Sequence, residues 1–564
     1  MTKQTLIEEL EQNLKEKDLS KDQLALLKIN LCAKHNVKKI PTDIEILLSV
    51  KDKDKLKTSL KTKPRRSGSG VAVVAVMSPP KGCPHGKCTF CPGGPGSYFG
   101  TMPQSYTGKE PSTLRAIRNK YDPYLITMNR LEQYIVMGHN PDKVEIIVMG
   151  GTFPALNKEF QEDFVKYIYK ALNDFSDLFY KNGELYFEKF KEFFELPGEV
   201  GNLARTENIH EKLLQLKGTN EDVDLEKEKK RNENSNIRCV ALCVETKPDW
   251  GFLEHGNHML KLGVTRVELG IQSTKDLPLQ LTNRGHDIKD TIRSLQELKD
   301  LGFKITAHAM PGLPGIKNKE EDLENLKELF SNADFRPDML KIYPCMVFPG
   351  TKMYEDWKSG KFNPISTEEA AEIIAEFKRY VPSYCRIMRV HRDIPSYQVA
   401  EGVKKTNLRQ YIKKIQDEKN IVCQCIRCRE PDPSYPLANI GAIKTKVFEY
   451  EASGGKEFFI SVENDDFILG FCRLRFPSKC LREEITEKSA LIRELHVYGE
   501  AASLGKDATV QHKGIGKMLM KKAEEIAHEN GKDKMVVISG IGVRPYYEKL
   551  SYSLQGPYMV KELV

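Results

Sequence analysis

The spacing of hydrophobic residues predicts a helical region at the start of the chain. Within residues 1–62, leucines recur at intervals of three or four residues in two groups: Leu6, Leu10 and Leu14, then Leu24, Leu27 and Leu31. That interval places the leucines of each group on one face of a helix. We therefore expect a small helical domain over residues 1–70, which ends in a Gly/Ser hinge.

From residue 71 onward, short β-branched runs alternate with amphipathic segments. The candidate strands are residues 71–77, 144–150, 237–245, 264–272, 303–310 and 339–346. Helical patterns lie between them at residues 155–180, 210–220, 287–301 and 320–332. Such alternation is typical of a parallel sheet. Six units are fewer than the eight of a closed barrel, so we expect an open, partial (β/α)6 barrel over residues 71–380. Its active site would lie at the carboxyl ends of the strands.

Three further segments complete this division. Residues 219–236 are almost uniformly polar, and we interpret them as an exposed loop or charged helix tip without chemistry. Residues 381–438 hold a cysteine cluster and a proline-rich end, which indicates a connector. Residues 439–564 begin with strand-like runs, followed by a glycine loop and a long helix. This last region predicts a separate α/β domain, and the whole chain a multidomain α/β protein.

The composition excludes several classes of protein. The chain has 564 residues, with 87 Lys and Arg against 79 Asp and Glu, a net charge of +8. The longest clean apolar run, Val71–Met77, is far shorter than the ~20 residues of a membrane helix, and residues 1–30 contain no apolar signal core. Thirteen cysteines, an odd number, make a poor disulfide framework without a secretion signal. We therefore expect a cytoplasmic protein with reduced thiols and no membrane association.

Basic residues are concentrated just before the first predicted strand. Residues 51–66 contain eight basic and two acidic residues, so this segment alone carries +6. Such a run attracts phosphate backbones by releasing their counterions. A solvated linker explains the same composition equally well.

The first of two cysteine clusters follows the first strand. The run CPHGKCTFCPGGPG places Cys83, Cys88 and Cys91 in a C-x4-C-x2-C spacing. Three thiolates on one short loop can hold three irons of a [4Fe–4S] cube and leave the fourth iron open to an external ligand. The alternatives are a zinc site that lacks its fourth ligand and three unrelated cysteines.

Residues at the ends of the following strands resemble the radical S-adenosylmethionine (SAM) superfamily. That superfamily usually has C-x3-C-x2-C, so the extra residue here is a departure, as is Thr152 in place of the Glu of its GGE motif. The resemblance implies that SAM binds the open iron and yields a 5′-deoxyadenosyl radical in a dry cavity. It also implies that SAM contacts come from four successive strand ends: Gly150, Gly151, Thr152, Glu245, Lys247, Gln272 and His308.

A glycine motif near the C-terminus predicts a diphosphate site. The run QHKGIG opens the helix GKMLMKKAEEIA. Glycines let backbone N–H groups approach a diphosphate, and a helix N-terminus adds partial positive charge. An ordinary strand-to-helix turn is the alternative. The motif resembles the Q-x-x-G-x-G loop of the GNAT acetyltransferases, which implies acetyl-CoA. The loop residues concerned are Gln511, Lys513, Gly514, Ile515, Gly516 and Lys517.

The combination of both regions closely resembles the family of the catalytic (third) subunit of Elongator. The resemblance covers residues 71–564 and includes the runs VMGGTFPAL, RVHRDIPS and ISGIGVRPYYEKLSY. It implies an enzyme that attaches an acetyl-CoA-derived carboxymethyl group to C5 of the wobble uridine of tRNA. As partners it implies tRNA, with other Elongator-type subunits or self-association.

The same resemblance assigns roles to single residues. Lys143 and the tyrosines Tyr546 and Tyr547 are the expected catalytic residues. Acetyl-CoA contacts are expected from Lys143 and Tyr547 and along one strand, at Glu494, Leu495, His496 and Val497. Independently of the resemblance, the basic charge of two segments leads us to expect that they hold tRNA phosphates: Lys61, Lys63, Arg65 and Arg66, and Arg115, Arg118 and Lys120. Two rival functions remain: a protein lysine acetyltransferase with a structural barrel, and a tRNA-binding assembly subunit with degenerate sites.

The second cysteine cluster predicts a structural zinc site. Cys423, Cys425 and Cys428 lie in the run CQCIRC, and His391 is our candidate for the fourth ligand. Four such donors would close a tetrahedral zinc site. Reduced, unliganded thiols are the alternative. We expect the seven remaining cysteines to pack in cores: Cys32, Cys239, Cys243, Cys345, Cys385, Cys472 and Cys480.

Overall fold

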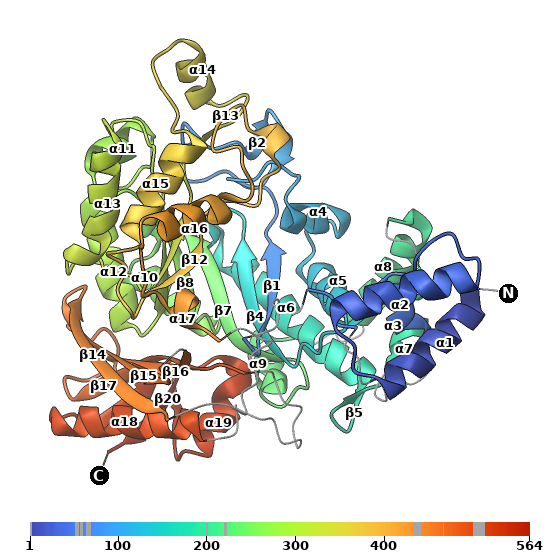
Figure 1. The fold of residues 1–564 in the computed structure, drawn as a ribbon. Helices are drawn as coiled ribbons and strands as arrows, with labels where there is room; N and C mark the ends of the chain where they lie inside the picture. The colour runs from blue at the N-terminus through green and yellow to red at the C-terminus, as the bar shows by residue number, and fades with distance from the viewer. Residues whose placement is uncertain are drawn as a thin grey trace.

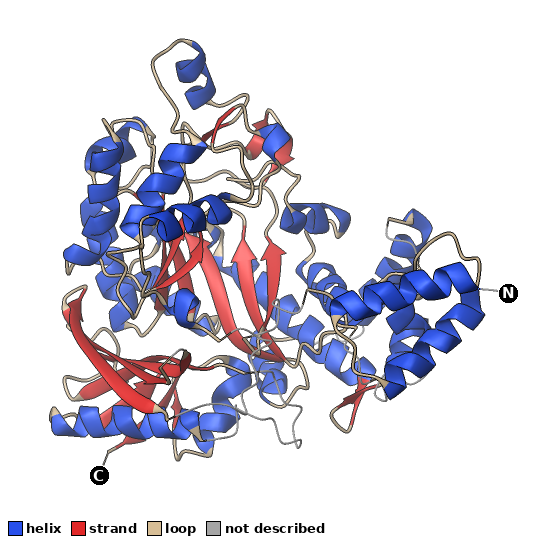
Figure 2. Cartoon of the chain, viewed as in Figure 1, coloured by secondary structure: helices blue, strands red, loops and turns tan. Residues whose placement is uncertain are grey.

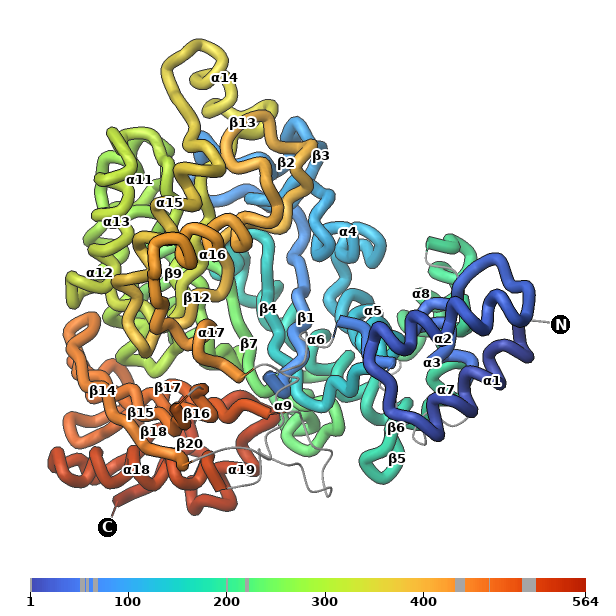
Figure 3. Tube along the Cα trace, in the orientation of Figure 1, coloured from blue at the N-terminus to red at the C-terminus, as the bar shows by residue number. Residues whose placement is uncertain are grey.

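The structure is a computed structural model that describes residues 3–50, 56, 60–63, 69–198, 201–218, 223–431, 442–465, 467–499 and 514–563. Figure 1 shows three parts: a cluster of N-terminal helices on the right, a central sheet surrounded by helices, and a second sheet below it. Figure 3 shows the course of the chain from blue at the N-terminal helices, through the central part, to red in the second sheet. No helix in the described ranges is long and apolar enough to cross a membrane.

The N-terminal region is helical, as the leucine spacing predicts. It contains α1 (Lys3–Glu16), α2 (Lys21–Lys34) and α3 (Asp43–Ser49). Leu6, Leu10 and Leu14 are almost fully buried against α2 and α3. The side chains of Ser20 and Thr42 cap the backbone N–H groups at the starts of α2 and α3. These caps satisfy backbone N–H groups that have no partner within the helix, and so fix where α2 and α3 begin.

The central sheet is parallel and has seven strands in the order β1-β4-β7-β8-β9-β10-β12. The strands are β1 (Ala72–Met77), β4 (Lys143–Met149), β7 (Arg238–Thr246), β8 (Arg266–Gln272), β9 (Lys304–Ala309), β10 (Met339–Ile342) and β12 (Arg386–Arg389). The six predicted strands are therefore confirmed. The seventh, β12, was missed because its four residues RIMR form no apolar run. The edge strands β1 and β12 are not paired with each other, so the barrel is open.

Helices cover the outer surface of this sheet, as Figure 2 shows. They include α5 (Pro123–Val136), α6 (Lys158–Phe179), α10 (Leu253–Lys261), α12 (Ile288–Asp300), α13 (Lys319–Ser331), α15 (Thr367–Phe377) and α16 (Leu408–Glu418). Helix α8 (Leu203–Gly218) packs on α5 and α6. Our interpretation of the polar segment 219–236 was wrong for its described part. Residues Leu225–Glu233 form helix α9, which packs on α6 and buries Asn232. Asn232 Oδ1 accepts the Cys239 N–H at 2.7 Å, so the polar side chains there satisfy buried backbone groups.

The C-terminal sheet has the strand order β14-β15-β16-β17-β18-β20-β19. Its strands are β14 (Lys444–Ala452), β15 (Gly455–Glu463), β16 (Ile468–Phe476), β17 (Ser489–Val497), β18 (Lys534–Val537), β19 (Ser553–Gln555) and β20 (Tyr558–Glu562). Helices α18 (Ile515–Glu529) and α19 (Arg544–Glu548) accompany them. Strand β17 pairs with the parallel strand β18 only from Ser489 to Ile492. Beyond Ile492, β17 continues to Val497 without β18, which leaves a gap between these strands.

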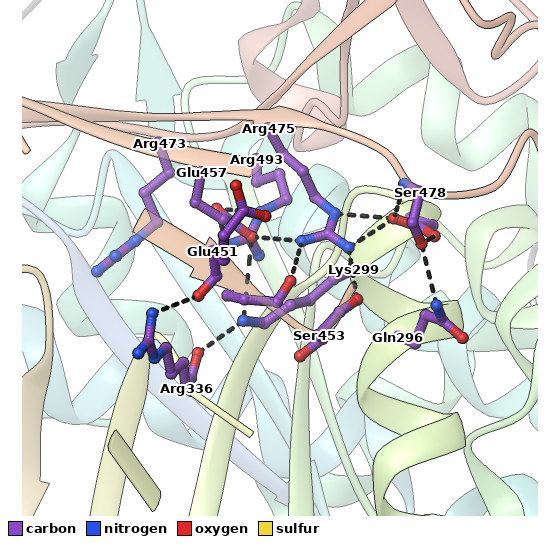
Figure 4. A network of polar contacts seen from close by, with 12 residues as sticks. Gln296, Lys299, Arg336, Glu451, Ser453, Glu457, Arg473, Arg475, Ser478 and Arg493 are labelled. Atoms are coloured by element: carbon purple, nitrogen blue, oxygen red, sulfur yellow. Dashed lines mark hydrogen bonds and ion pairs between the residues drawn. The ribbon is translucent and has the colours of Figure 1, made fainter. Parts of the chain in front are cut away.

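A buried network of ion pairs joins the two sheets (Figure 4). Arg475 of β16 contacts Asp300 at the end of α12 at 2.6 Å and Glu457 of β15 at 2.9 Å. Arg493 of β17 contacts Asp338, which precedes β10, at 2.5 Å. All five side chains are fully buried. The packing is equally close nearby, because a Cβ on Gly540 would lie 2.1 Å from the carbonyl oxygen of Val240 in β7. The two sheets therefore form one continuous packed body.

Candidate active site

A cavity of about 840 Å³ lies at the carboxyl ends of the parallel strands. Cys83, Cys88 and Cys91 form part of its wall. Other wall residues come from the strand ends of β4, β7, β8, β9 and β10: Gly151, Thr152, Glu245, Lys247, Gln272, His308 and Lys341. The cavity therefore lies at the edge of the sheet where we predicted the active site.

The cysteine loop is arranged for a group larger than a single metal ion. Among the described residues, only Cys423, Cys425 and Cys428 bring three ligand atoms within 4.8 Å of one another. The sulfurs of Cys83, Cys88 and Cys91 are spaced more widely, which fits three corners of an iron–sulfur cube better than one ion. A turn closed by the Gly86 N–H and the Cys83 carbonyl at 3.0 Å accommodates the extra residue of the C-x4-C spacing.

Each of these sulfurs has a polar neighbour. Thr152 Oγ1 lies 3.5 Å from Cys83 Sγ, and the Ser105 N–H donates to Cys91 Sγ at 3.2 Å. Burial raises the pKa of Cys83 and raises that of Cys91 to about 11. These thiols therefore become thiolates only when a cation stabilises them, which a bound iron cluster would do.

The glycine pair after β4 lies beside the cysteine loop. Gly150 and Gly151 have φ values of +122° and +101°, which side chains rarely adopt. A Cβ on Gly151 would lie 3.1 Å from Gln104 Cβ and 3.7 Å from Cys83 Sγ. Glycine is therefore required at this strand end, which packs directly against the cysteine loop.

Of the other predicted SAM residues, Glu245 and Lys247 have polar partners, whereas the side-chain oxygen of Gln272 is buried without one. Tyr106 donates to Glu245 at 3.2 Å, and burial, aided by the charge of Glu268, raises the pKa of Glu245. Lys247 pairs with Asp249 at 3.1 Å, and burial lowers its pKa. Gln272 ends β8 with a φ of +66°, a strained value for a residue with a side chain.

The sequence analysis missed a charged cluster on the floor of the cavity. His308 Nε2 lies 2.9 Å from Glu268 Oε2, and Lys341 forms a short ion pair with the same carboxylate. Arg266 lies 3.0 Å from the other oxygen of Glu268. Although burial alone would raise it, the charges of Lys341 and Arg266 hold the pKa of Glu268 well below its usual range. The signal in the sequence was a charged residue inside an otherwise apolar strand, in VELGIQ and MLKIYP.

The C-terminal sheet presents its own predicted residues at the end of β17. Arg473 donates to Glu494 at 2.8 Å, and Lys304 of the barrel lies 3.9 Å from the same side chain. Burial lowers the pKa of His496 to about 4, although Glu494 opposes this shift, and the nearby charge of Lys143 adds to it. Leu495 and Val497 are partly buried on the same strand. The predicted acetyl-CoA residues therefore meet the amino-terminal end of the barrel sheet.

The two predicted tyrosines have different surroundings near the start of α18. Gly514 caps the helix, whose first turn contains Ile515, Gly516 and Lys517. A Cβ on Gly516 would lie 2.8 Å from the Tyr546 hydroxyl, so Tyr546 covers this turn. Tyr547 instead packs in the core of the sheet and is only 6% exposed. Gln511 and Lys513 lie outside the described residues.

The second cysteine cluster forms without the predicted histidine. Hydrogen bonds from Cys423 and Cys428 lower the pKa of Cys425, so this triad is arranged for a metal ion. His391 is not part of the group, because its Nε2 lies 3.5 Å from the Val403 carbonyl oxygen. The prediction of His391 as a ligand was wrong. His391 lies 32 residues before Cys423 in the chain, and the sequence does not show how far apart the two are in the fold. All thirteen cysteines are free thiols, and Cys480 is exposed rather than buried in a core as we expected.

The predicted tRNA residues fall in different places. Arg115 and Arg118 lie on α4 (Pro111–Arg118) and line the cavity, and Lys120 follows this helix. Lys61 and Lys63 precede β1, whereas Arg65 and Arg66 lie outside the described residues. Five further arginines on the cavity wall were missed: Arg130, Arg284, Arg389, Arg392 and Arg427.

Comparisons with known proteins agree with these two sites. The radical SAM superfamily matches residues 77–329, its C-terminal domain matches residues 337–418, and the acetyltransferase (GNAT) family matches residues 423–552. The chain therefore combines a radical SAM half-barrel with a GNAT acetyltransferase domain. The first implies a [4Fe–4S] cluster and SAM, and the second implies acetyl-CoA.

Similar proteins cover nearly the whole chain. A tRNA uridine(34) acetyltransferase of Methanocaldococcus infernus is 45% identical over 93% of this chain and 92% of its own length. Elongator complex protein 3 of Homo sapiens is 39% identical over 99% of this chain and 95% of its own length. The solved structure of Methanocaldococcus infernus Elp3 with an N-terminal deletion (1–46) matches with a TM-score of 0.69 and 41% identity, over 88% of this chain and 100% of that one. The chain belongs to the Elongator complex protein 3 (Elp3) family.

Proposed function

We propose that this protein modifies the wobble uridine of tRNA and attaches an acetyl-CoA-derived carboxymethyl group to C5 of the base. Relatives named tRNA uridine(34) acetyltransferase are 45% and 44% identical over 93% of the chain, which supports the substrate. Uridine C5 is not electrophilic toward a carbon nucleophile, which favours a radical route. Radical SAM and GNAT regions in one polypeptide supply the two chemistries that such a product needs.

One observation carries the proposal: single strands of the barrel connect the two sites. Strand β9 begins at Lys304, whose Nζ lies 3.9 Å from Glu494 of the GNAT sheet. The same strand carries His308, which lines the cavity beside the cysteine loop. Strand β4 likewise begins at Lys143 and ends next to Gly150. At about 3.3 Å per residue, such strands place the two sites roughly 20 Å apart.

The bound cofactors would supply the carbon-centred radical and the two-carbon unit. The chain's own residues hold them and exclude water. Cys83, Cys88 and Cys91 would hold the cluster, and SAM would be held at the strand ends that carry Gly150 to Thr152, Glu245, Lys247, Gln272 and His308. Glu494 to Val497 would pair with the pantetheine arm, because β17 has no β18 partner there. Tyr546 and the first turn of α18 would face the diphosphate end, Tyr547 would support this helix from the core, and Lys143 would meet the acetyl group.

The arginines on the cavity wall fit an RNA ligand. Arg115, Arg118 and Arg130 come from the β1 side of the open barrel, and Arg389, Arg392 and Arg427 come from the β12 side. Guanidinium groups on both sides of an opening suit the phosphates that flank one extruded nucleotide. Anticodon loops present unstacked bases, which an enzyme can take into such a cavity.

A zinc ion at Cys423, Cys425 and Cys428 would act as a clamp between the two domains. The segment after these cysteines contacts both, because Arg429 pairs with Glu463 of β15 at 2.6 Å and Glu430 pairs with Arg386 of β12 at 2.6 Å. We also propose a cytoplasmic location, which thirteen free thiols support, and assembly with Elongator-type subunits or with a second copy.

The test uses the full chain, reconstituted with iron and sulfide without oxygen. With tRNA, SAM, reductant and acetyl-CoA, nucleoside mass spectrometry should show a carboxymethyl adduct on uridine, together with released 5′-deoxyadenosine. Cys88→Ala should abolish both signals. Cys345→Ala is the matched control, because this thiol packs against the same loop but belongs to neither of the two cysteine clusters.

Other outcomes would contradict the proposal. Unchanged uridine with acetylated lysines on an added protein would establish the lysine acetyltransferase instead. Binding of tRNA without turnover of either cofactor would establish the non-enzymatic alternative.

A further inference from the structure

Arg284 lies in a turn that is fixed directly to the cysteine loop. The Thr89 N–H donates to the Thr282 carbonyl at 3.1 Å, and Asn283 Nδ2 donates to the Lys87 carbonyl at 3.0 Å. These bonds hold the residues on either side of Cys88 against the residues that precede Arg284. The position of the guanidinium relative to Cys88 is therefore set by the backbone of both loops.

The guanidinium of Arg284 contacts a cluster ligand. Its Nη1 lies 3.3 Å from Cys88 Sγ, and its Nη2 donates to the Gly270 carbonyl at 2.6 Å. His85 Nε2 lies 3.2 Å from the same sulfur. Cys83 and Cys91 have only uncharged hydrogen-bond neighbours in the described chain.

Arg284 is buried, with 7% of its surface exposed, yet no carboxylate in the described residues forms an ion pair with it. Its neighbour Lys247 is balanced by Asp249 at 3.1 Å. In addition, Nε of Arg284 has no hydrogen-bond partner, and the side chain lines the cavity. A buried guanidinium without a counter-ion is costly, so the structure requires an anion beside Cys88.

We propose that Arg284 sets the reduction potential of the iron–sulfur cluster, as a positioning residue that donates to the Cys88 thiolate and balances its negative charge. This inference rests on the proposed cluster at Cys83, Cys88 and Cys91. A cation and a hydrogen bond at a ligand sulfur stabilise the reduced cluster, which carries one more negative charge, and so raise its potential. Arg284 would thereby make the cluster easier to reduce.

The experiment measures the midpoint potential of the reconstituted full-length protein by a mediated redox titration followed by electron paramagnetic resonance. Arg284→Met removes the charge and the donor at similar volume. We expect the equilibrium constant for reduction of its cluster to fall about tenfold. For one electron, this makes the midpoint potential about 59 mV more negative. Arg284→Lys keeps the charge but not both hydrogen bonds, so its potential should lie between that of wild type and that of Arg284→Met. The control is Arg379→Met, an exposed arginine paired with Glu376.

Iron content and SAM binding separate the outcomes. Wild type that fails to take up about four irons would refute the proposed cluster rather than the role of Arg284. If Arg284→Met holds its full iron content and has the same potential as wild type, the proposed role of Arg284 is overturned. This holds even if the variant binds SAM more weakly. If Arg284→Met does not hold iron, Arg284→Lys decides: a potential equal to that of wild type overturns the inference, and a lower potential supports it.

Discussion

Arg493 of β17 donates two hydrogen bonds to the Asp338 carboxylate, at 2.8 Å and 2.5 Å, across the boundary between the barrel and the GNAT sheet. Both side chains are fully buried. Arg493 precedes Glu494 on the strand proposed to hold acetyl-CoA, and Asp338 precedes β10 of the barrel. Asp338 also accepts the Ile305 N–H of β9 at 2.8 Å. This pair therefore fixes the distance between the two sites.

Removal of Arg493 should strongly destabilise the protein. Arg493→Met leaves the buried carboxylates of Asp338 and Glu457 short of a partner, and an uncompensated buried charge costs about 3–5 kcal/mol. We expect the free energy of unfolding in urea to fall by that order. Lys413→Met is the control, because its ion pair with Asp417 is largely exposed and should contribute little. Equal losses in the two variants would contradict this account of the interface.

Two histidines with lowered pKa values should make stability depend on pH in mildly acidic solution. Burial lowers the pKa of His286 to about 2 and that of His496 to about 4, whereas an unfolded histidine titrates near 6.5. Below about pH 6.5 the unfolded chain binds protons that the native protein does not, so the free energy of unfolding should fall as the pH falls. Each histidine contributes at most about 1.4 kcal/mol per pH unit.

The measurement is urea unfolding at several pH values between 7 and 5, above the range in which most carboxylates titrate. His286→Asn should reduce the dependence of stability on pH. His528→Asn should not, since His528 is exposed. Identical slopes in wild type and His286→Asn would show that this histidine is not held neutral.

The sequence predicted the parts of the fold that depend on long apolar runs. Six barrel strands were found because each contains consecutive β-branched or aliphatic residues, whereas β12 was missed because RIMR has only two apolar residues, between two arginines. Motif residues such as Cys83 and Gly151 were found because their chemistry requires a local spacing. Arg284 was not, because it lies in a turn, and only the folded chain brings it to Cys88. The prediction of His391 as a zinc ligand was wrong for a related reason: the sequence does not show that the folded chain keeps this histidine away from the three cysteines.

Loss of one thiol in the second cysteine cluster should remove zinc and weaken the domain contact. Cys425→Ser should reduce zinc, measured by plasma mass spectrometry, from about one atom per chain to near zero. It should also lower the thermal unfolding temperature, because the segment that carries Arg429 and Glu430 is no longer held. Iron content should be unchanged, since the two clusters are separate. Cys480→Ser, which replaces an exposed thiol, should retain zinc. Zinc retained in Cys425→Ser would refute the site.

Neutralisation of basic residues before β1 should weaken tRNA binding and reduce its salt dependence. Replacement of four residues by alanine, Lys61, Lys63, Arg65 and Arg66, removes charges from a segment that carries +6. Each lost phosphate contact should lower the slope of log Kd against log salt by about 0.7 to 0.9. Arg118→Ala, on the cavity wall, should lower the slope by about one such contact. The slopes come from binding isotherms of fluorescent tRNA at several salt concentrations.

The charge-matched control removes four exposed lysines near and on α16: Lys404, Lys405, Lys413 and Lys414. It has the same change in net charge, so a general electrostatic effect would alter both slopes alike. A specific interface requires that only the variants before β1 and on α4 change. If the affinity and slope of the quadruple variant equal those of wild type while Arg118→Ala changes both, the RNA contacts the cavity rim and the basic segment is a solvated linker.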